Sequence, residues 1–335
     1  MSYMETLPWP FMVAEIGASH NGTLARAHDL VDAAADSGAD AVKFQTYTPE
    51  TLAVDKPITA GPWAGRTYHE LYREAMTPWE WLPDLFHHAH ARGLKAFSSP
   101  FSPSAVKFLE GLDCPMYKIA SPEIAYEDLI RAAAVTGKPV ILSSGMATHQ
   151  EMRRAVDTVN CFGSGQVVLL HCVSAYPATP EQYNLPALGY LRNLVGAFIG
   201  LSDHTLGSAV AVAAVAKGAM MVEKHFTLKR SDGGPDAAFS SEPGEFAAMA
   251  RDCRTVAAAC RPRTVSESDT SRQYKRSLWV TKPVNAGEAF SHDNVGVLRP
   301  AGGLSPYTLF AVLGQVAARD IPAGTALSRD HVRIR

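Results

Sequence analysis

Eight short apolar runs alternate with amphipathic segments from Phe11 to His225, and this alternation is the feature that most constrains the fold. Strict alternation of strand and helix predicts parallel strands joined by helical crossovers. Eight such units within about 220 to 240 residues favour a closed (β/α)8 TIM barrel over an open doubly wound sheet. The predicted strands cover residues 11–16, 41–45, 94–98, 116–120, 139–143, 167–171, 197–201 and 220–225.

Helical patterns lie between most of these strands. They cover residues 24–37, 78–92, 104–109, 127–136, 149–160 and 206–217. An open sheet of the dinucleotide-binding type would place a run of three spaced glycines after the first strand. Only Gly17 and Gly22 occur there, which again favours the barrel.

The alternation stops near Arg261. Residues 261–275 are polar and contain Pro262 and several serines, which predicts a linker after a barrel domain of residues 1–260. The remaining residues, 276–335, have short β-type runs at 277–281 and 295–299 and several glycine-containing turns. They predict a small, turn-rich β domain, which could act as a binding module.

Composition excludes some classes of partner. The formal net charge of −2 gives no general attraction to nucleic acid or to an anionic membrane. The five cysteines are scattered without a Cys-x-x-Cys spacing, which is typical of reduced thiols. No apolar run reaches membrane-spanning length, and the first residues lack the pattern of a secretion signal. We therefore expect a cytoplasmic protein with no nucleic-acid or membrane partner.

Two histidines, His204 and His225, follow the ends of neighbouring predicted strands, with an Ala-rich helical pattern between them. Parallel strands present their carboxyl ends on one side, where ligands bind. Two neutral imidazoles there can share a divalent cation and leave room for oxygen ligands from a substrate. The alternative is a pair of hydrogen-bonded core histidines.

Several cationic and hydroxyl side chains also stand at predicted strand ends. They are Lys43, Lys118, Ser121, Ser143 and Ser202. A chain with little net charge must bind an anion with a few aimed donors, and these groups together could surround one phosphate. The alternatives are turns or helix N-caps for the serines and surface salt bridges for the lysines.

Glu15 lies inside the apolar run 13–16, where an unpaired charge is costly, so we expect it to have a polar partner from the protein or a substrate. The run containing His87, His88 and His90 resembles a metal site at first reading. On an amphipathic helix we expect it to form a solvated face instead.

Six segments, in order, resemble the motifs of the sialic acid synthase family, whose members condense phosphoenolpyruvate with an amino-sugar aldehyde. The last 60 residues resemble the antifreeze-like (SAF) domain of that family, a β-clip type of fold, through Arg299-Pro300 and Gly302-Gly303-Leu304. The resemblance implies a phosphoenolpyruvate-dependent transferase that forms a carbon–carbon bond. The six segments are residues 14–22, 42–46, 117–121, 143–146, 201–205 and 223–227.

The resemblance also implies roles for particular residues. A divalent metal, usually Mn2+ in the family, with Mg2+ or Co2+ as possible substitutes, would be held by His204 and His225. Glu123 would handle a proton or position the substrate, with Glu15 and Lys118 as further catalytic groups. Asp236 would contact the sugar, although an ordinary turn residue is the alternative. Phosphoenolpyruvate would be bound by Lys43, Lys118, Ser121, Ser143, Asn184 and Ser202.

Residues 45–49, 68–81 and 230–240 are similar to the pseudaminic acid branch of the family. The implied sugar is 2,4-diacetamido-2,4,6-trideoxy-β-L-altrose, and the alternatives are the sialic or legionaminic acid substrates. Three positions depart from the family pattern: Ser19, Ser241 and Ala301 replace a usual asparagine, leucine and glycine. The aromatic residues that could line an apolar sugar site, or belong to the core, are Trp63, Tyr68, Trp79 and Trp81.

In the family, the arginine that matches Arg299 reaches the sugar in the barrel of the other subunit. The resemblance thus implies a domain-swapped homodimer, whereas surface solvation is the alternative for a lone arginine.

Two other classes of protein remain as alternatives. One is a metal-independent barrel aldolase that forms a Schiff base through Lys118. The other is a non-catalytic sugar-binding protein that works through its small domain.

Overall fold

In a computed structural model, which describes residues 3–262 and 270–334, eight parallel strands close into a barrel in which each strand pairs with its neighbours in sequence order. Strands β1 and β8 pair in parallel and complete the closure. This confirms the predicted (β/α)8 barrel. The strands are β1 (Phe11–Glu15), β2 (Ala41–Thr46), β3 (Lys95–Pro100), β4 (Tyr117–Ile119), β5 (Val140–Ser143), β6 (Val167–Cys172), β7 (Phe198–Asp203) and β8 (Met221–His225).

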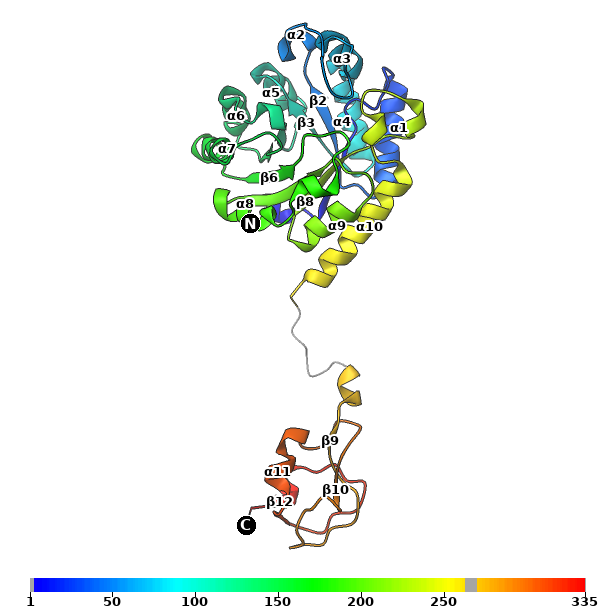
Figure 1. Cartoon of the computed structure of the whole chain (residues 1–335), viewed down its shortest axis with the longest axis vertical. Coiled ribbons are helices and arrows are strands. Elements are labelled where there is room, and N and C mark those ends of the chain that lie inside the picture. Colours follow the sequence, from blue (N-terminus) through cyan, green and yellow to red (C-terminus); the bar gives the residue numbers. More distant parts are fainter. Residues whose placement is uncertain (1–2, 263–269, 335) are drawn as a thin grey trace. The chain divides into compact units, whose positions relative to one another are not determined.

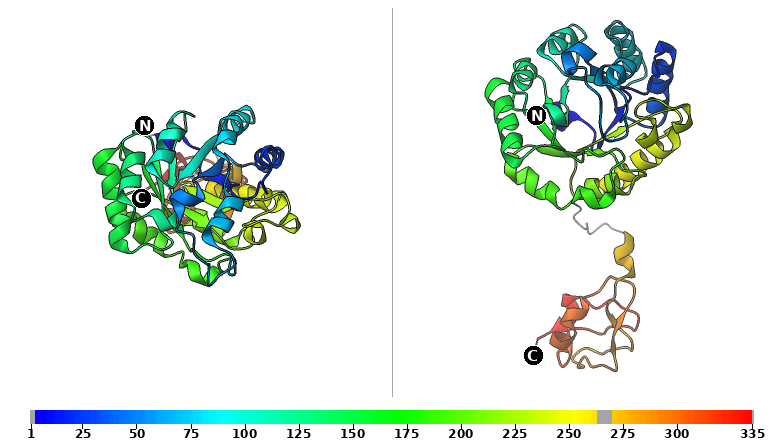
Figure 2. Two further views of the ribbon diagram at one scale, coloured as in Figure 1. Left: turned by 90° about the horizontal axis from the view of Figure 1, so that it is seen from above. Right: turned by 45° about the horizontal axis from the view of Figure 1, so that its top comes forward.

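A ring of helices surrounds the strands (Figures 1 and 2). Because the strands are covered on both faces, nearly all of their residues are buried. The helices of the ring are α1 (Leu24–Asp36), α4 (Leu82–Ala91), α5 (Pro103–Glu110), α6 (Glu127–Ala134), α7 (His149–Phe162), α8 (Ala187–Val195), α9 (Ala209–Ala216) and α10 (Pro243–Cys260).

Local sequence explains where several helices begin. The Thr23 side chain accepts a hydrogen bond from the backbone of Arg26 and caps α1. A reciprocal capping box joins Thr148 and Glu151 at the start of α7. Polar caps of this kind satisfy backbone donors that have no partner within the helix.

The structure adds elements that the periodicity did not predict. Helix α8 is one, and the short helices α2 (Pro49–Leu52) and α3 (Tyr68–Ala75) form an insertion between β2 and α4. The helix expected over residues 78–92 is divided into a 3-10 turn, Trp79–Trp81, and α4.

The chain divides into two compact units, Met1–Arg261 and Pro262–Arg335. The second unit contains antiparallel pairs of β9 (Ser277–Val280) with β10 (Val295–Leu298) and of β11 (Val316–Ala317) with β12 (Val332–Arg333), and the short helix α11 (Leu309–Val312). Its own core includes Leu278, Phe290 and Leu327. Residues 263–269 of the linker expected over 261–275 lie outside the described residues, and Thr270–Tyr274 form a 3-10 turn. Across the described ranges, none of the helices is both long enough and apolar enough to cross a membrane.

Candidate active site

The carboxyl ends of the barrel strands surround a cavity of about 590 Å³ lined by polar groups at its floor and aromatic groups at its rim. Strand register explains why the polar groups meet. Glu15 on β1 lies beside Lys43 on β2 and beside His225 on β8, and Ser202 on β7 lies beside Glu223 on β8. Polar residues that are distant in sequence therefore converge at one place, as is usual for this fold.

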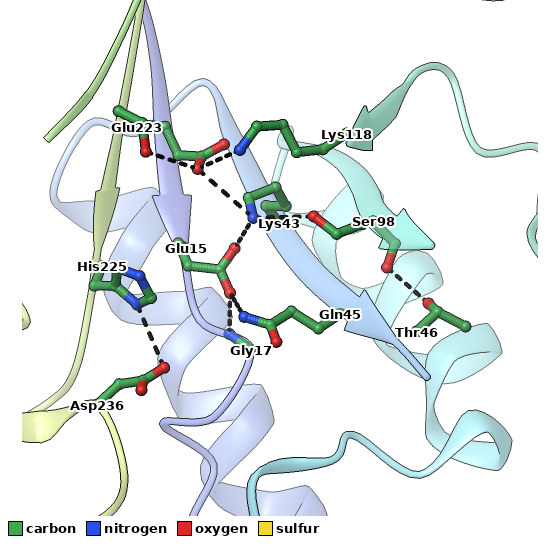
Figure 3. Close-up of polar contacts among 12 residues, drawn as sticks. Glu15, Gly17, Lys43, Gln45, Thr46, Ser98, Lys118, Glu223, His225 and Asp236 are labelled. Carbon is green, nitrogen blue, oxygen red and sulfur yellow. Dashed lines mark hydrogen bonds and ion pairs between the residues drawn. The ribbon is translucent and has the colours of Figure 1, made fainter. Parts of the chain in front are cut away.

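Two lysines and two glutamates form a buried ion-pair network at the cavity floor (Figure 3). Lys43 pairs with Glu15 and lies 3.7 Å from Glu223, and Lys118 lies 2.9 Å from Glu223. Glu15 also accepts hydrogen bonds of 2.9 Å from the Gln45 amide and from the backbone of Gly17. The expectation that Glu15 has a polar partner is confirmed.

The network sets the ionisation of its members. Burial alone would raise the pKa of Glu223, but the ammonium groups of Lys118 and Lys43 lower that pKa to about 2. Burial lowers the pKa of Lys118, and Lys43 adds to this effect against the attraction of Glu223. Burial also lowers the pKa of Lys43, but the carboxylates of Glu15 and Glu223 outweigh this effect, so the pKa of Lys43 is raised overall. Two cationic and two anionic groups thus cancel in charge.

Hydroxyl groups lie beside this network. Ser202 donates to Glu223 over 3.3 Å, and Ser121 accepts from the backbone N–H of Gly145 over 3.0 Å. The hydroxyls of Ser143 and Ser174 are buried with no hydrogen-bond partner in the described chain, although both residues line the cavity. A buried donor without a partner is costly, so these two hydroxyls are free to bind a ligand.

Gly145 is required for this arrangement. A Cβ atom at this position would collide with the Ser174 hydroxyl and would lie 2.8 Å from the Ser121 hydroxyl and 3.1 Å from the Cys172 sulfur. The absent side chain therefore leaves room for three polar atoms at the cavity wall.

Asn184 does not line the cavity. It is exposed and adopts a left-handed backbone conformation, φ 42°, at the end of a 3-10 turn. Its predicted contact with phosphoenolpyruvate stays a prediction. Ser174, which the sequence reasoning did not select, occupies the cavity instead.

His204 and His225 both line the cavity, and their ring centroids lie 5.5 Å apart. The Nδ1 atom of His204 donates to the carbonyl of Val173 over 2.7 Å, which leaves Nε2 as a lone-pair donor. Burial, reinforced by His225, lowers the pKa of His204 to about 3, so its imidazole is neutral. The Nδ1 atom of His225 lies 3.4 Å from the Asp236 carboxylate.

These features fit a divalent cation. Neutral imidazoles with one nitrogen fixed by a carbonyl or carboxylate are common metal ligands. No group of three or more His, Cys, Asp or Glu side chains is arranged to hold a metal within residues 3–262 and 270–334. The protein would therefore supply two ligands and leave the other positions to substrate oxygens or water.

Glu123 follows β4 and lines the cavity, with its Oε2 atom buried and without a hydrogen-bond partner in the described chain. Burial raises its pKa to about 7. The group can therefore hold or release a proton near neutral pH. Asp236, from the loop after β8, also lines the cavity.

The four aromatic candidates separate into two pairs. Trp63 and Tyr68 line the cavity. Trp81 packs against the barrel core and the ring of His20, so for this residue the core alternative is correct. Trp79 is half-buried against Phe108 and does not line the cavity. His87 and His90 are exposed and His88 pairs with Asp32, which confirms the solvated face.

Sequence reasoning missed Gln45, Tyr176 and Glu223 in addition to Ser174, and all four line the cavity. Strand periodicity could have indicated Glu223, because it stands two residues before His225 and points to the same side of β8. Lys224 points the other way and pairs with Asp203 over 2.6 Å. Arg299 is exposed in the second unit.

Fold and site together define a class: a TIM-barrel protein with buried lysine–glutamate pairs and serine hydroxyls beside a pair of histidines. The NeuB family model matches residues 30–263 and the SAF domain model matches residues 275–333. The chain belongs to the NeuB family, in agreement with the resemblance to sialic acid synthases.

Known relatives refine this placement. The pseudaminic acid synthase of Helicobacter pylori is 42% identical over 335 aligned residues, which cover 96% of this chain and 98% of that protein. The N,N'-diacetyllegionaminic acid synthase of Legionella pneumophila is 34% identical, with 96% and 94% covered. The crystal structure of a sialic acid synthetase from Leptospira borgpetersenii in complex with citrate superposes with a TM-score of 0.71 at 30% identity, covering 79% of this chain and 90% of that one.

Proposed function

We propose that this protein is a pseudaminic acid synthase. It condenses phosphoenolpyruvate with 2,4-diacetamido-2,4,6-trideoxy-β-L-altrose and water to give pseudaminic acid and phosphate. The observation that carries the proposal is one cavity in which two buried lysines and unpartnered serine hydroxyls adjoin a pair of histidines. The 42% identity to the Helicobacter pylori pseudaminic acid synthase supports the choice of sugar.

Phosphoenolpyruvate binds at the cavity floor. Lys43 and Lys118 are 4% and 3% exposed, so their ammonium groups face the ligand with little competition from water. Ser121, Ser143 and Ser202 add hydroxyl groups, and Ser174 adds another. Asn184 remains a predicted ligand from the family resemblance.

A divalent cation, Mn2+ as the first choice, is held by His204 and His225. The charge balance of the floor supports it, because the paired lysines and glutamates leave no net positive charge to offset a dianionic substrate. Held by these two histidines, such an ion would supply Lewis-acid polarisation of the aldehyde oxygen and a common point of attachment for the two substrates.

The reaction forms one carbon–carbon bond and exchanges one carbon–oxygen bond for another. The methylene carbon of phosphoenolpyruvate bonds to the aldehyde carbon, the water oxygen bonds to the adjacent carbon, and the bond from that carbon to the phosphate oxygen breaks. Of the two protons of the water, one ends on the former aldehyde oxygen and one on the departing phosphate. Glu123 can carry a proton between these oxygens, since its pKa of about 7 allows both protonation states. Lys43, Lys118 and the serines stabilise the departing phosphate, and Glu15 fixes the Lys43 ammonium group.

The histidine pair argues against a Schiff-base aldolase. Such an aldolase works through Lys118 without a metal, and it would have no use for His204 and His225 in the same cavity. A sugar-binding protein without catalysis would not explain the buried ion pairs at the barrel floor.

The rim suits the proposed sugar. Apolar and aromatic side chains surround the outer cavity, where a methyl group and two acetamido groups would lie. They include Leu52, Ile58, Trp63, Tyr68, Leu71, Tyr72 and Phe101.

We further propose that the chain forms a domain-swapped homodimer in the cytoplasm, in which Arg299 of one subunit reaches the sugar in the barrel of the other. Five free cysteines are consistent with a reducing compartment.

Phosphate release with phosphoenolpyruvate and a panel of amino sugars tests the proposal. We expect the diacetamido-trideoxy-altrose to give a much higher kcat/KM than N-acetylmannosamine or the legionaminic acid precursor. If either of those is the better substrate, the chain is a sialic or legionaminic acid synthase and not a pseudaminic acid synthase. Activity that persists with a chelator would contradict the metal.

A further inference from the structure

A hairpin from the insertion after β2 lies over the rim of the cavity. Residues 56–68 form it through a β-bridge of Pro57 with Thr67 and hydrogen bonds from Ile58 to Arg66 and from Tyr68 to Lys56. Ile58, Ala60 and Trp63 from this hairpin line the cavity.

Trp63 joins the hairpin to the loop that carries Asp236. Its indole N–H donates to the carbonyl of Pro235 over 3.0 Å, a contact between segments 172 positions apart in the sequence. Its ring lies 5.9 Å from that of Tyr176, and the Tyr176 ring lies 4.3 Å from His204. Trp63 thus contacts both the loop that carries Asp236 and the tyrosine that packs on His204.

Contacts on both sides of two glycines hold this loop. Its first part is held by Arg26, which pairs with Asp232 over 2.8 Å, and by Asn21, which donates to Gly233. Gly233 and Gly234 follow with positive φ angles of 72° and 109°, conformations that favour glycine. Beyond them, the Ser240 hydroxyl donates to the Asp236 carbonyl from within the loop, and the Trp63 indole N–H ties Pro235 to a different segment.

The position of Asp236 matters because its carboxylate lies 3.4 Å from His225 and the residue lines the cavity. The lysines and predicted serines assigned above to phosphoenolpyruvate come from strands β2, β4, β5 and β7 or directly follow them, whereas the indole N–H of Trp63 bonds to the loop after β8.

We propose that Trp63 is a positioning residue for the amino-sugar substrate: its indole N–H holds Pro235, and through it Asp236, over the outer cavity. The inference rests on the proposed function for the identity of the ligand. The backbone contact itself does not depend on that identity.

The test compares Trp63→Phe with Trp9→Phe. Both substitutions keep an aromatic ring and delete one indole hydrogen bond of 3.0 Å to a backbone carbonyl. Trp9 precedes β1, at the opposite end of the barrel, and bonds to Ala219. We expect Trp63→Phe to raise the KM for the amino sugar about fivefold, the worth of one hydrogen bond, with the KM for phosphoenolpyruvate within about twofold of the native value. Trp9→Phe should change neither KM.

Hydrogen exchange gives a readout that needs no substrate. In Trp63→Phe, amides in both 57–67 and 234–240 should exchange faster, whereas Trp9→Phe should leave these segments unchanged. Equal rises in both KM values, or native exchange in 234–240, would overturn the proposal. If no amino sugar supports phosphate release by the native chain, the proposed function fails, and the exchange comparison alone then decides the role of Trp63.

Discussion

At the scale of single residues, Glu123 should make stability depend on pH. Its pKa is raised from 4.5 to about 7 by burial, so the folded chain binds more protons than the unfolded chain between these values. Stability should therefore fall as pH rises through this window, by up to about 3 kcal/mol. Glu123→Gln removes the ionisable group and should flatten the fall.

Urea unfolding of the native chain and of Glu123→Gln between pH 5 and 8 measures this difference. Glu127→Gln serves as a control, because the Glu127 side chain is exposed to solvent and its ion pair with Arg154 lies at the surface. Parallel pH profiles for the native chain and Glu123→Gln would contradict the raised pKa.

Ser174 and Asn184 give a second test at this scale. Ser174→Ala removes a buried hydroxyl that has no partner and lines the cavity, so the KM for phosphoenolpyruvate should rise about fivefold. Asn184, the ligand that the family resemblance implies, is exposed in this structure, so Asn184→Ala tests whether it reaches the substrate. Steady-state phosphate release at saturating amino sugar measures both variants. A KM within about twofold of the native value for Asn184→Ala would contradict the predicted contact, and a native KM for Ser174→Ala would contradict the role of that hydroxyl.

At the scale of elements, the ends of β7 and β8 present the histidine pair. His204→Ala and His225→Ala should each abolish turnover and weaken Mn2+ binding, without unfolding the barrel, because each ring supplies a lone pair at a strand end. Electron paramagnetic resonance of Mn2+ measures binding, and circular dichroism checks the fold. His87→Ala, on an exposed helix face, is the matched control. Native Mn2+ affinity in both site variants would refute the ligand assignment.

The sequence patterns of individual strands and helices also explain how much of the fold could be predicted. The barrel strands are apolar runs bounded by polar ends, and such runs were sufficient to predict all eight and the residues at their ends. Helix α8 was not predicted although Leu188 and Leu191 have helical spacing; Gly189, a weak helix former, lies between them in this short helix. The contact of Trp63 with Pro235 joins distant loops, and no local pattern encodes such a contact.

At the scale of the whole molecule, positive and negative charges nearly cancel, both in the complete chain and in the ion-pair network of the site. A formal net charge of −2 gives no long-range attraction for an anionic substrate, so binding depends on groups aimed from several strands. Glu15, Lys43, Lys118 and Glu223 come from four different strands, β1, β2, β4 and β8. This ion-pair network therefore exists only in the closed barrel, and partial unfolding of any of these strands would remove it.

The second unit provides the last prediction, which concerns the proposed domain-swapped dimer. Arg299→Ala and His204→Ala should each be inactive alone. In a swapped heterodimer, the barrel of the Arg299→Ala subunit keeps His204 and receives Arg299 from the other subunit, so one of its two sites is intact. Random exchange of equal amounts should therefore restore about a quarter of the native activity. Native mass spectrometry with one subunit isotope-labelled shows whether exchange has occurred. Without a swap, each barrel keeps one defect, so complete exchange with no recovery of activity would refute the swapped arrangement.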